Sequence, residues 1–169
     1  VELFVKEGDF PRARKLLTDR LNQKVKSLTL EEYYHRMMVV IGDTQAVIEN
    51  ADHAIEAFIR DNRMDLAIAA FTDCLKINKS YRPSSLKATL TLATSLASKL
   101  KSNLLIQLLT GCHKRFPDNV QVAEAYLLLA ETFAINKNDS SKAQQYISFV
   151  KKHYPTYANH PKLAELSTI

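Results

Sequence analysis

Two short segments of the chain have nearly the same pattern of residues, and this duplication constrains the fold more than any other feature. KRFPD at Lys114–Asp118 and KHYPT at Lys152–Thr156 each combine basic residues, an aromatic ring and a proline, and they begin 38 residues apart. Helical periodicity precedes both segments, and proline ends a helix because it lacks a backbone donor and clashes with the preceding turn. The pattern predicts one structural unit that occurs twice.

Aligning the two units on their prolines brings further residues into register. The matched positions are Leu92–Ala93 with Leu129–Ala130, Leu105 with Ala143, and Cys112 with Val150. A period of roughly 34 to 40 residues built from two helices is typical of a helical solenoid. No stretch alternates apolar and polar residues as a strand would, and Gly and Pro are scarce. We therefore expect an all-α chain.

The segment LAETFAINKNDSSKA at Leu129–Ala143, closed by Tyr154–Pro155, resembles the tetratricopeptide repeat (TPR) family. In that family a small residue of the first helix packs against small residues of the second helix. GDFPRARKLL, with Ala13, and NRMDLAIAAFTDC, with Ala67 and Cys74, resemble the turn and second helix of further repeats. The resemblance implies a right-handed α-solenoid of antiparallel helix pairs, with about nine or ten helices.

The resemblance also implies a single domain over residues 1–169, in which the first repeat is truncated at residue 1 and residues 156–169 form a terminal cap helix. The chain begins with Val1, so we expect it to be a piece of a longer protein. Between Leu30 and Arg60 the alternation is interrupted near Gly42–Asp43. This region is either one long kinked helix or contains an extra helix.

Capping residues predict where several helices begin. Ser84 or Ser85 can open a helix that runs to about Leu100. Earlier in the chain, Asn62 can open the helix that contains LAIAAFTDCLKI. A further helix is expected from about Leu104 to Lys114, ahead of Pro117.

The composition excludes few classes of protein. The net charge is +5, and lysines gather at helix ends, where the helix dipole favours cations, so a basic surface needs no further explanation. No apolar run approaches the roughly 18 residues that span a bilayer. We expect a soluble domain of a bacterial protein, cytoplasmic rather than secreted. Any membrane tether would lie ahead of residue 1.

No set of residues in the sequence proposes a reaction. The five histidines are scattered, and neither a metal-binding HExxH nor a glycine-rich phosphate loop occurs. Cys74 and Cys112 lie where the repeat family prefers a small buried residue, and free cysteine packs as a small hydrophobic side chain. We expect a protein that is not an enzyme, with no metal and no cofactor.

The segment LKATLTLATSLASKL at Leu86–Leu100 is the most informative about binding. It carries no charge between Lys87 and Lys99, and hydroxyl side chains form a stripe on one side. In TPR proteins the first helices line a concave, peptide-binding face. When the positions of this face in the TPR family are transferred to the aligned units of this chain, they fall on Lys87, Leu90, Thr94, Ser98, Glu124, Leu127, Glu131 and Ile135. We expect Leu127 to be exposed there, ready for a partner.

These observations favour a non-catalytic module that binds a peptide or a partner helix in a concave groove. The resemblance does not extend to the chaperone-binding subclass, which grips a terminal carboxylate with Lys, Arg and Asn, because apart from Lys87 these residues are missing. The alternative is a structural or regulatory segment that packs against another domain of the same protein. A basic solenoid that binds nucleic acid is a minor alternative, since arginine clusters and exposed rings are not evident.

Overall fold

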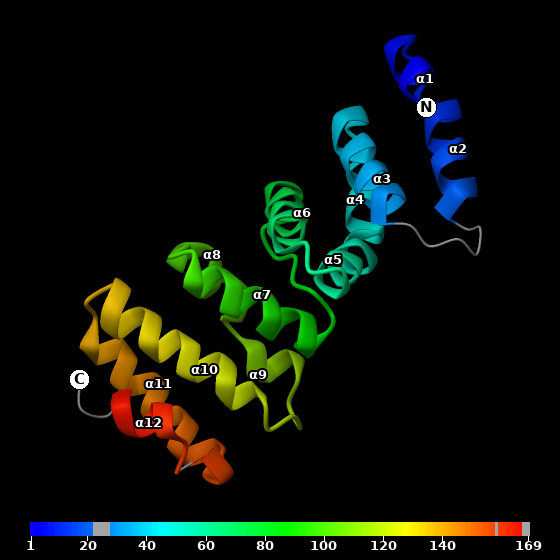
Figure 1. The fold of residues 1–169 in the computed structure, drawn as a ribbon. Helices are drawn as coiled ribbons and strands as arrows, with labels where there is room; N and C mark the ends of the chain where they lie inside the picture. Colours follow the sequence, from blue (N-terminus) through cyan, green and yellow to red (C-terminus); the bar gives the residue numbers. More distant parts are fainter. Residues whose placement is uncertain (22–27, 158, 167–169) are drawn as a thin grey trace. The chain divides into compact units, whose positions relative to one another are not determined.

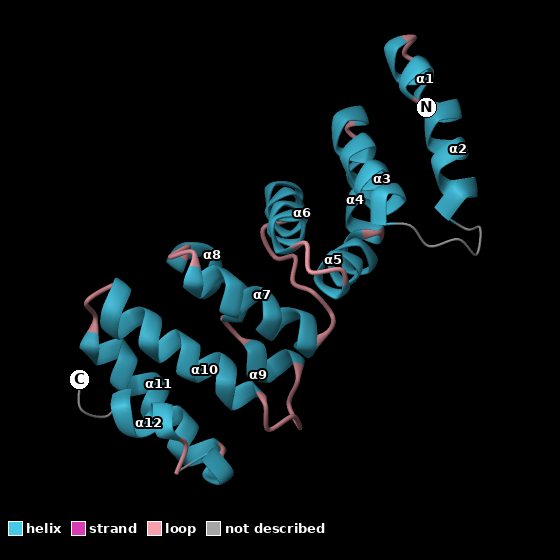
Figure 2. Ribbon diagram, in the orientation of Figure 1, coloured by secondary structure: helices cyan, strands magenta, loops and turns pink. Residues whose placement is uncertain are grey.

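The computed structural model describes residues 1–21, 28–157 and 159–166, and it divides them into two compact units, Val1–Ser84 and Ser85–Ile169. Each unit is a set of helices joined by short turns, and no strand occurs in the described ranges (Figures 1 and 2). The expected all-α fold is confirmed. A single domain over residues 1–169 stays a prediction, and the two units are considered separately.

The helices of the first unit are α1 (Glu2–Lys6), α2 (Phe10–Leu21), α3 (Leu28–Ile41), α4 (Thr44–Glu49), α5 (Ala51–Arg60) and α6 (Met64–Ile77). Helix α1 packs on α2 and α5 packs on α6, and α3 and α4 lie between these two pairs in the sequence. The strongest packing is between α5 and α6, and α3 contacts α2, α4, α5 and α6. Helices joined by such short turns run antiparallel.

The second unit is organised around one central helix. Its helices are α7 (Leu86–Ser98), α8 (Ser102–Leu109), α9 (Cys112–Arg115), α10 (Val122–Glu131), α11 (Ser140–His153) and α12 (Pro161–Leu166). A π-helical turn at Thr132–Asn136 extends α10, and a 3₁₀ turn at Pro155–Tyr157 precedes α12. Helix α10 contacts α7, α8, α9, α11 and α12, and α11 is its main partner. The expected terminal helix is α12.

Small residues lie at the contacts between paired helices, as the register predicted. Helix α5 buries Ala54 and Ala57, and its partner α6 buries Ala67 and Ala70. The predicted small positions Ala13, Ala67, Cys74, Ala93, Cys112, Ala130 and Ala143 are all buried. A side chain that ends at Cβ lets two helix axes approach closely, so larger neighbours such as Phe58 and Phe71 can pack beside the contact.

The ambiguous region from Leu30 to Arg60 contains all but the first two residues of α3, all of α4 and all of α5. Gly42, with φ of +77°, ends α3, and Asp43 caps α4 by accepting a hydrogen bond from the backbone of Ala46 at 2.9 Å. Asn50 separates α4 from α5. The short helix α4 is therefore the extra helix that interrupts the alternation of pairs.

Two of the expected helix boundaries differ from the structure. Ser85 caps α7 as expected, since its hydroxyl accepts from the backbone of Ala88 at 3.2 Å. Asn62, however, does not cap α6; it adopts a left-handed conformation, with φ of 59°, in the turn after α5. The expected helix from Leu104 to Lys114 is broken at Gly111, where φ is +73°, a conformation that favours glycine.

No helix in the described residues is both long enough and apolar enough to cross a membrane.

A test of the helix contacts is to enlarge Ala143, which is 3% exposed in the pair formed by α10 and α11. Ala143→Leu should lower the free energy of unfolding by about 1–3 kcal/mol, because the added carbons have no space. The measurement is urea unfolding followed by circular dichroism. Gln144→Leu, at the exposed neighbouring position, is the control and should stay within about 0.5 kcal/mol of the wild type. Equal effects of both changes would show that the register is wrong.

Candidate partner-binding site

Helix α7 presents one polar, nearly uncharged face to solvent. Its apolar side is buried through Leu92, Ala93 and Leu96, so the opposite side is left exposed at Lys87, Thr94 and Ser98. The hydroxyls of this helix are internally satisfied: Thr94 donates to the carbonyl of Leu90 at 3.0 Å, and Thr91 to that of Lys87 at 2.8 Å. These side chains can therefore accept a partner without leaving a buried polar group unpaired.

Helix α10 supplies the other half of the predicted face, and here the expectation of exposure is wrong. Leu127 is 1% exposed. Its neighbours on that face are engaged by the end of the chain: the Tyr157 hydroxyl donates to Glu124 at 3.1 Å, and Lys162 of α12 forms a close ion pair with Glu131. Helix α12 contacts α10, so segments near the end of the chain already bind the two glutamates of the stripe that was expected to face a partner.

Ile135 is the last predicted member of the stripe, and it is 63% exposed. It lies in the π-helical turn Thr132–Asn136, whose wider winding interrupts the i, i+4 row through Leu127 and Glu131. Asn136, the last residue of this turn, donates to Ser102 at 3.2 Å, and Lys137, the residue after it, donates to Asn103 at 2.7 Å. The structure therefore places Lys87, Thr94 and Ser98 together, and it does not join them to Leu127.

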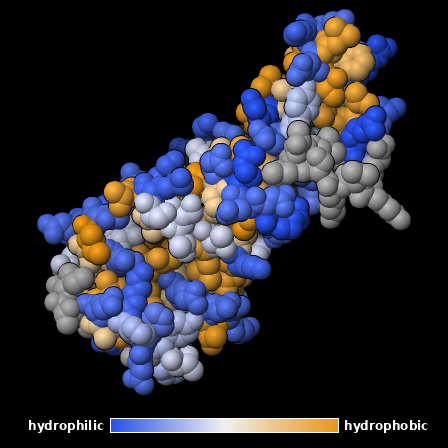
Figure 3. Space-filling model, viewed as in Figure 1, coloured by the Kyte–Doolittle hydropathy of each residue, from blue (hydrophilic) through white to orange (hydrophobic). Residues whose placement is uncertain are grey.

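An aromatic pocket lies on the other side of α10. It has a volume of about 410 Å³ and is lined by Thr110, Gly111, His113, Lys114, Tyr126, Leu129, Gln145, Tyr146 and Phe149. The break at Gly111 separates α8 from α9, and Gly111 meets no other atom within 4 Å of where a Cβ would stand. In the view of Figure 3, apolar atoms of the second unit lie among hydrophilic side chains rather than in one continuous face.

The rings around this pocket pack on one another. The Tyr126 centroid is 4.5 Å from that of Phe149 and 5.8 Å from that of Tyr146, and the His113 ring lies 5.3 Å from Phe149. The Tyr126 hydroxyl also forms a close hydrogen bond with His113 Nδ1. Burial raises the pKa of Tyr126 to about 12, so the phenol stays neutral and keeps its proton.

The sequence analysis missed this pocket, although one signal was available. Tyr146 and Phe149 are three residues apart, a spacing that places two rings on one face of a helix. Most of the remaining lining residues come from α9, α10 and the turn between α8 and α9, and no local pattern shows that these segments meet α11.

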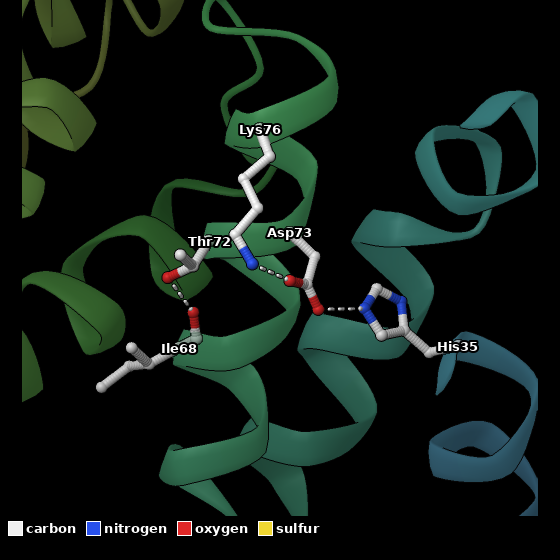
Figure 4. A network of polar contacts seen from close by, with 5 residues as sticks. All are labelled: His35, Ile68, Thr72, Asp73 and Lys76. Carbon is white, nitrogen blue, oxygen red and sulfur yellow. Dashed lines mark hydrogen bonds and ion pairs between the residues drawn. The ribbon is translucent and has the colours of Figure 1, made fainter. Parts of the chain in front are cut away.

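The first unit contains a buried polar cluster, which Figure 4 shows from close by. His35 Nε2 lies 3.5 Å from Asp73 Oδ2, and the other carboxylate oxygen accepts from Lys76 at 2.8 Å. Nearby, Glu31 of α3 pairs with His53 of α5 at 2.7 Å. These contacts join α3 to α5 and α6. They satisfy the buried groups only in part, because both ring nitrogens of His35 and Oε2 of Glu31 are buried without a hydrogen bond.

Burial dominates the titration of His35, which is 5% exposed. Removal from water lowers the pKa of His35 below 6.5, and the nearby Asp73 only partly offsets this effect. The imidazole is therefore neutral in the folded chain at neutral pH. The cluster around His35 has neither the oriented nucleophile nor the open cavity that a reaction would need, so we interpret it as structural.

The two cysteines are buried and unpaired by disulfides. Burial, together with the carboxylates of Asp73 and Asp52, raises the pKa of Cys74 to about 12, and burial also raises the pKa of Cys112. Both side chains are therefore thiols rather than reactive thiolates, in agreement with their predicted role as small core residues. In the described part of the chain no three side chains are arranged to hold a metal ion.

Comparison with known proteins adds one structural similarity. No protein-family model matches the chain, and no curated protein matches it significantly. The fold is similar to that of YrrB, a solved structure described as "a TPR protein with an unusual peptide-binding site". The two are 14% identical, the alignment covers 99% of this chain and 88% of that chain, and the TM-score is 0.48. The TPR-like character of this chain rests on its own paired helices and their buried small residues.

The lowered pKa of His35 predicts that acid destabilises the fold. Between pH 6.5 and the lower pKa of the folded state, the unfolded chain binds a proton at His35 that the folded chain does not, so stability falls as the pH falls through this window. The free energy of unfolding, measured in urea at several pH values, should show this slope. His35→Leu should reduce it.

His153→Gln, which changes an exposed histidine, is the matched control and should leave the slope unchanged. An identical pH dependence in His35→Leu and the wild type would contradict the assignment to His35.

Proposed function

We propose that this chain is a non-catalytic protein-interaction module that binds a peptide or a partner helix along the exposed face of α7. The observation that carries the proposal is this face itself, where Lys87, Thr94 and Ser98 are exposed and Leu90 is half-buried. Its hydroxyls bond within the helix, and it carries little charge that a partner would have to displace from water.

Binding here would follow the usual pattern of a peptide in a preformed groove. A rigid helix that is capped at Ser85 and packed through Leu92 and Leu96 loses little conformational freedom when a partner arrives. Leu90 offers an apolar contact, and Lys87 offers a single charge that can fix the orientation of an acidic residue. The face carries no aromatic ring and one cation, which favours a protein partner over nucleic acid.

One observation favours the alternative function, in which the module packs against its own chain. Tyr157 and Lys162 already occupy the acidic face of α10 through Glu124 and Glu131. The chain therefore uses part of the predicted stripe for intramolecular packing. A partner that engaged both α7 and the two glutamates of α10 would have to displace Tyr157 and Lys162, whereas a partner confined to α7 would not.

The test is photocrosslinking from α7. A photoreactive residue at Thr94 should crosslink the partner, and one at Ser141, an exposed position on α11, should not. The crosslinked peptide is identified by mass spectrometry, and its synthetic copy is then titrated. Thr94→Arg should weaken that titration about tenfold, or about 1.4 kcal/mol, and should change the free energy of unfolding by less than about 0.5 kcal/mol.

Two results would count against the α7 face. Crosslinks from Ser141 but not from Thr94 would move the binding site to another surface. Crosslinks from Thr94 only to other segments of the same chain would favour the alternative of intramolecular packing.

A further inference from the structure

We propose that the aromatic pocket formed by α9, α10 and α11 is a second binding site, which receives one bulky apolar side chain of an acidic peptide. The pocket is distinct from the α7 face, and the proposal does not depend on that face being used.

The shape of the pocket suits a single anchoring side chain. Its volume of about 410 Å³ lies at the lower end of the range for ligand sites, roughly 300–1,000 Å³. The walls are mainly the rings of Tyr126, Tyr146 and Phe149, and the polar atoms are few. Apolar walls with a small number of polar groups favour burial of an apolar side chain, with the polar groups left to contact a peptide backbone.

The pocket is held open before any ligand arrives. Tyr126 is 4% exposed, packs on Phe149 and Tyr146, and is hydrogen-bonded to His113, so three helices fix its ring. Gly111 contributes no side chain at the place where α8 ends and α9 begins. Because little must be reorganised, an inserted side chain would lose less of its binding energy to ordering the site.

The charge around the pocket selects an acidic partner. Lys114, in the wall, is exposed, and no carboxylate lines the pocket. Lys142 and Lys152 lie four residues before Tyr146 and three residues after Phe149, so α11 presents cations on the same face at both ends of its aromatic pair. Lys142 is paired with Asp139 at 3.5 Å, and its Nζ lies 5.1 Å from the centre of the Phe133 ring, so Lys114 and Lys152 supply the net positive charge of this surface. Such a surface attracts acidic segments and repels basic ones.

The same features disfavour nucleic acid as the occupant. Single-stranded nucleic acid stacks its bases on exposed ring faces. Here the rings are tilted against one another, at 39° between Tyr126 and Phe149, and they cover each other's faces. The nearby guanidinium of Arg115 donates one N–H to the carbonyl of Leu108 at 2.9 Å and lies over the Phe116 ring, so part of the N–H edge that would bind a phosphate is already engaged.

The pocket and the stripe expected from the sequence lie on opposite sides of α10. Tyr126 and Leu129 line the pocket, whereas Glu124, Leu127 and Glu131 face the end of the chain. Residues two apart on a helix differ by about 200° in direction, so Glu124 and Tyr126 point to opposite sides. Helix α12 can therefore cover one side without closing the pocket on the other.

The experiment uses a short synthetic peptide in which one tryptophan is flanked on both sides by glutamates and aspartates. The chain contains no tryptophan, so emission from the probe reports its own surroundings. On titration with the full chain at low salt, the emission should shift to shorter wavelength as the indole leaves water. An alanine version of the peptide should fail to compete, and a version flanked by lysines should show no shift.

Variants locate the binding. Lys114→Glu, at an exposed position of the wall, should weaken the acidic probe about tenfold, which corresponds to about 1.4 kcal/mol. Gln145→Phe, which fills the pocket from an exposed position on α11, should abolish the shift. Lys99→Glu makes the same change of charge at an exposed position outside the pocket and should alter the affinity less than twofold, roughly. Thr94→Arg should leave the titration unchanged, which separates this site from the α7 face.

Three outcomes would overturn the proposal. The first is the absence of an emission shift with the acidic probe. The second is an equal loss of affinity in Lys114→Glu and Lys99→Glu, which would show general attraction between charges. The third is tighter binding of oligothymidylate than of the acidic probe, lost in Lys114→Glu, which would assign the pocket to nucleic acid. Circular dichroism of each variant checks that the helices are retained.

Discussion

The close approach of paired helices at alanine is the contact on which the rest of this structure depends. Ala67 and Ala143 lie in the second helices of their pairs, and both are buried where a longer side chain would force the axes apart. Aromatic and leucine side chains then fill the space around each contact, as Phe71 does beside Ala67 and Ala70. The polar ties between helices, such as His35 with Asp73, fix orientation but cannot replace this packing.

Much of this packing could be predicted from the sequence, because aligning one repeat with the other shows which positions keep a small residue. Ala93 and Ala130 were identified by aligning the two repeats and Ala13 by the resemblance to the TPR family, and each is buried. Leu127 shows where the method fails. Its position on the helix was predicted from spacing, but Leu127 is 1% exposed because α10 packs against helices on several sides, and no local pattern in the sequence shows those contacts.

Breaks in helices were harder to predict than the helices themselves. Gly42 and Gly111 both adopt positive φ. A kink or a break was expected at Gly42–Asp43, whereas neither was expected at Gly111. At Gly111 the hydrophobic period continues across the break through Leu109 and Cys112. The aromatic pocket was missed for the same reason, since it exists only where α8 gives way to α9.

The π-helical turn at Thr132–Asn136 has a consequence for how this chain can change in length. A π turn holds one residue more than the α turn it replaces, so it is where a single insertion can be absorbed within a helix. Asn136 and Lys137, which bridge to Ser102 and Asn103, follow directly from that extra residue. A homologue one residue shorter here would keep α10 straight, lose both bridges and rotate everything after the turn by about 100° relative to α10. A change of length at this turn would therefore change the direction in which the exposed face of α11 points, although the residues of α11 stayed the same.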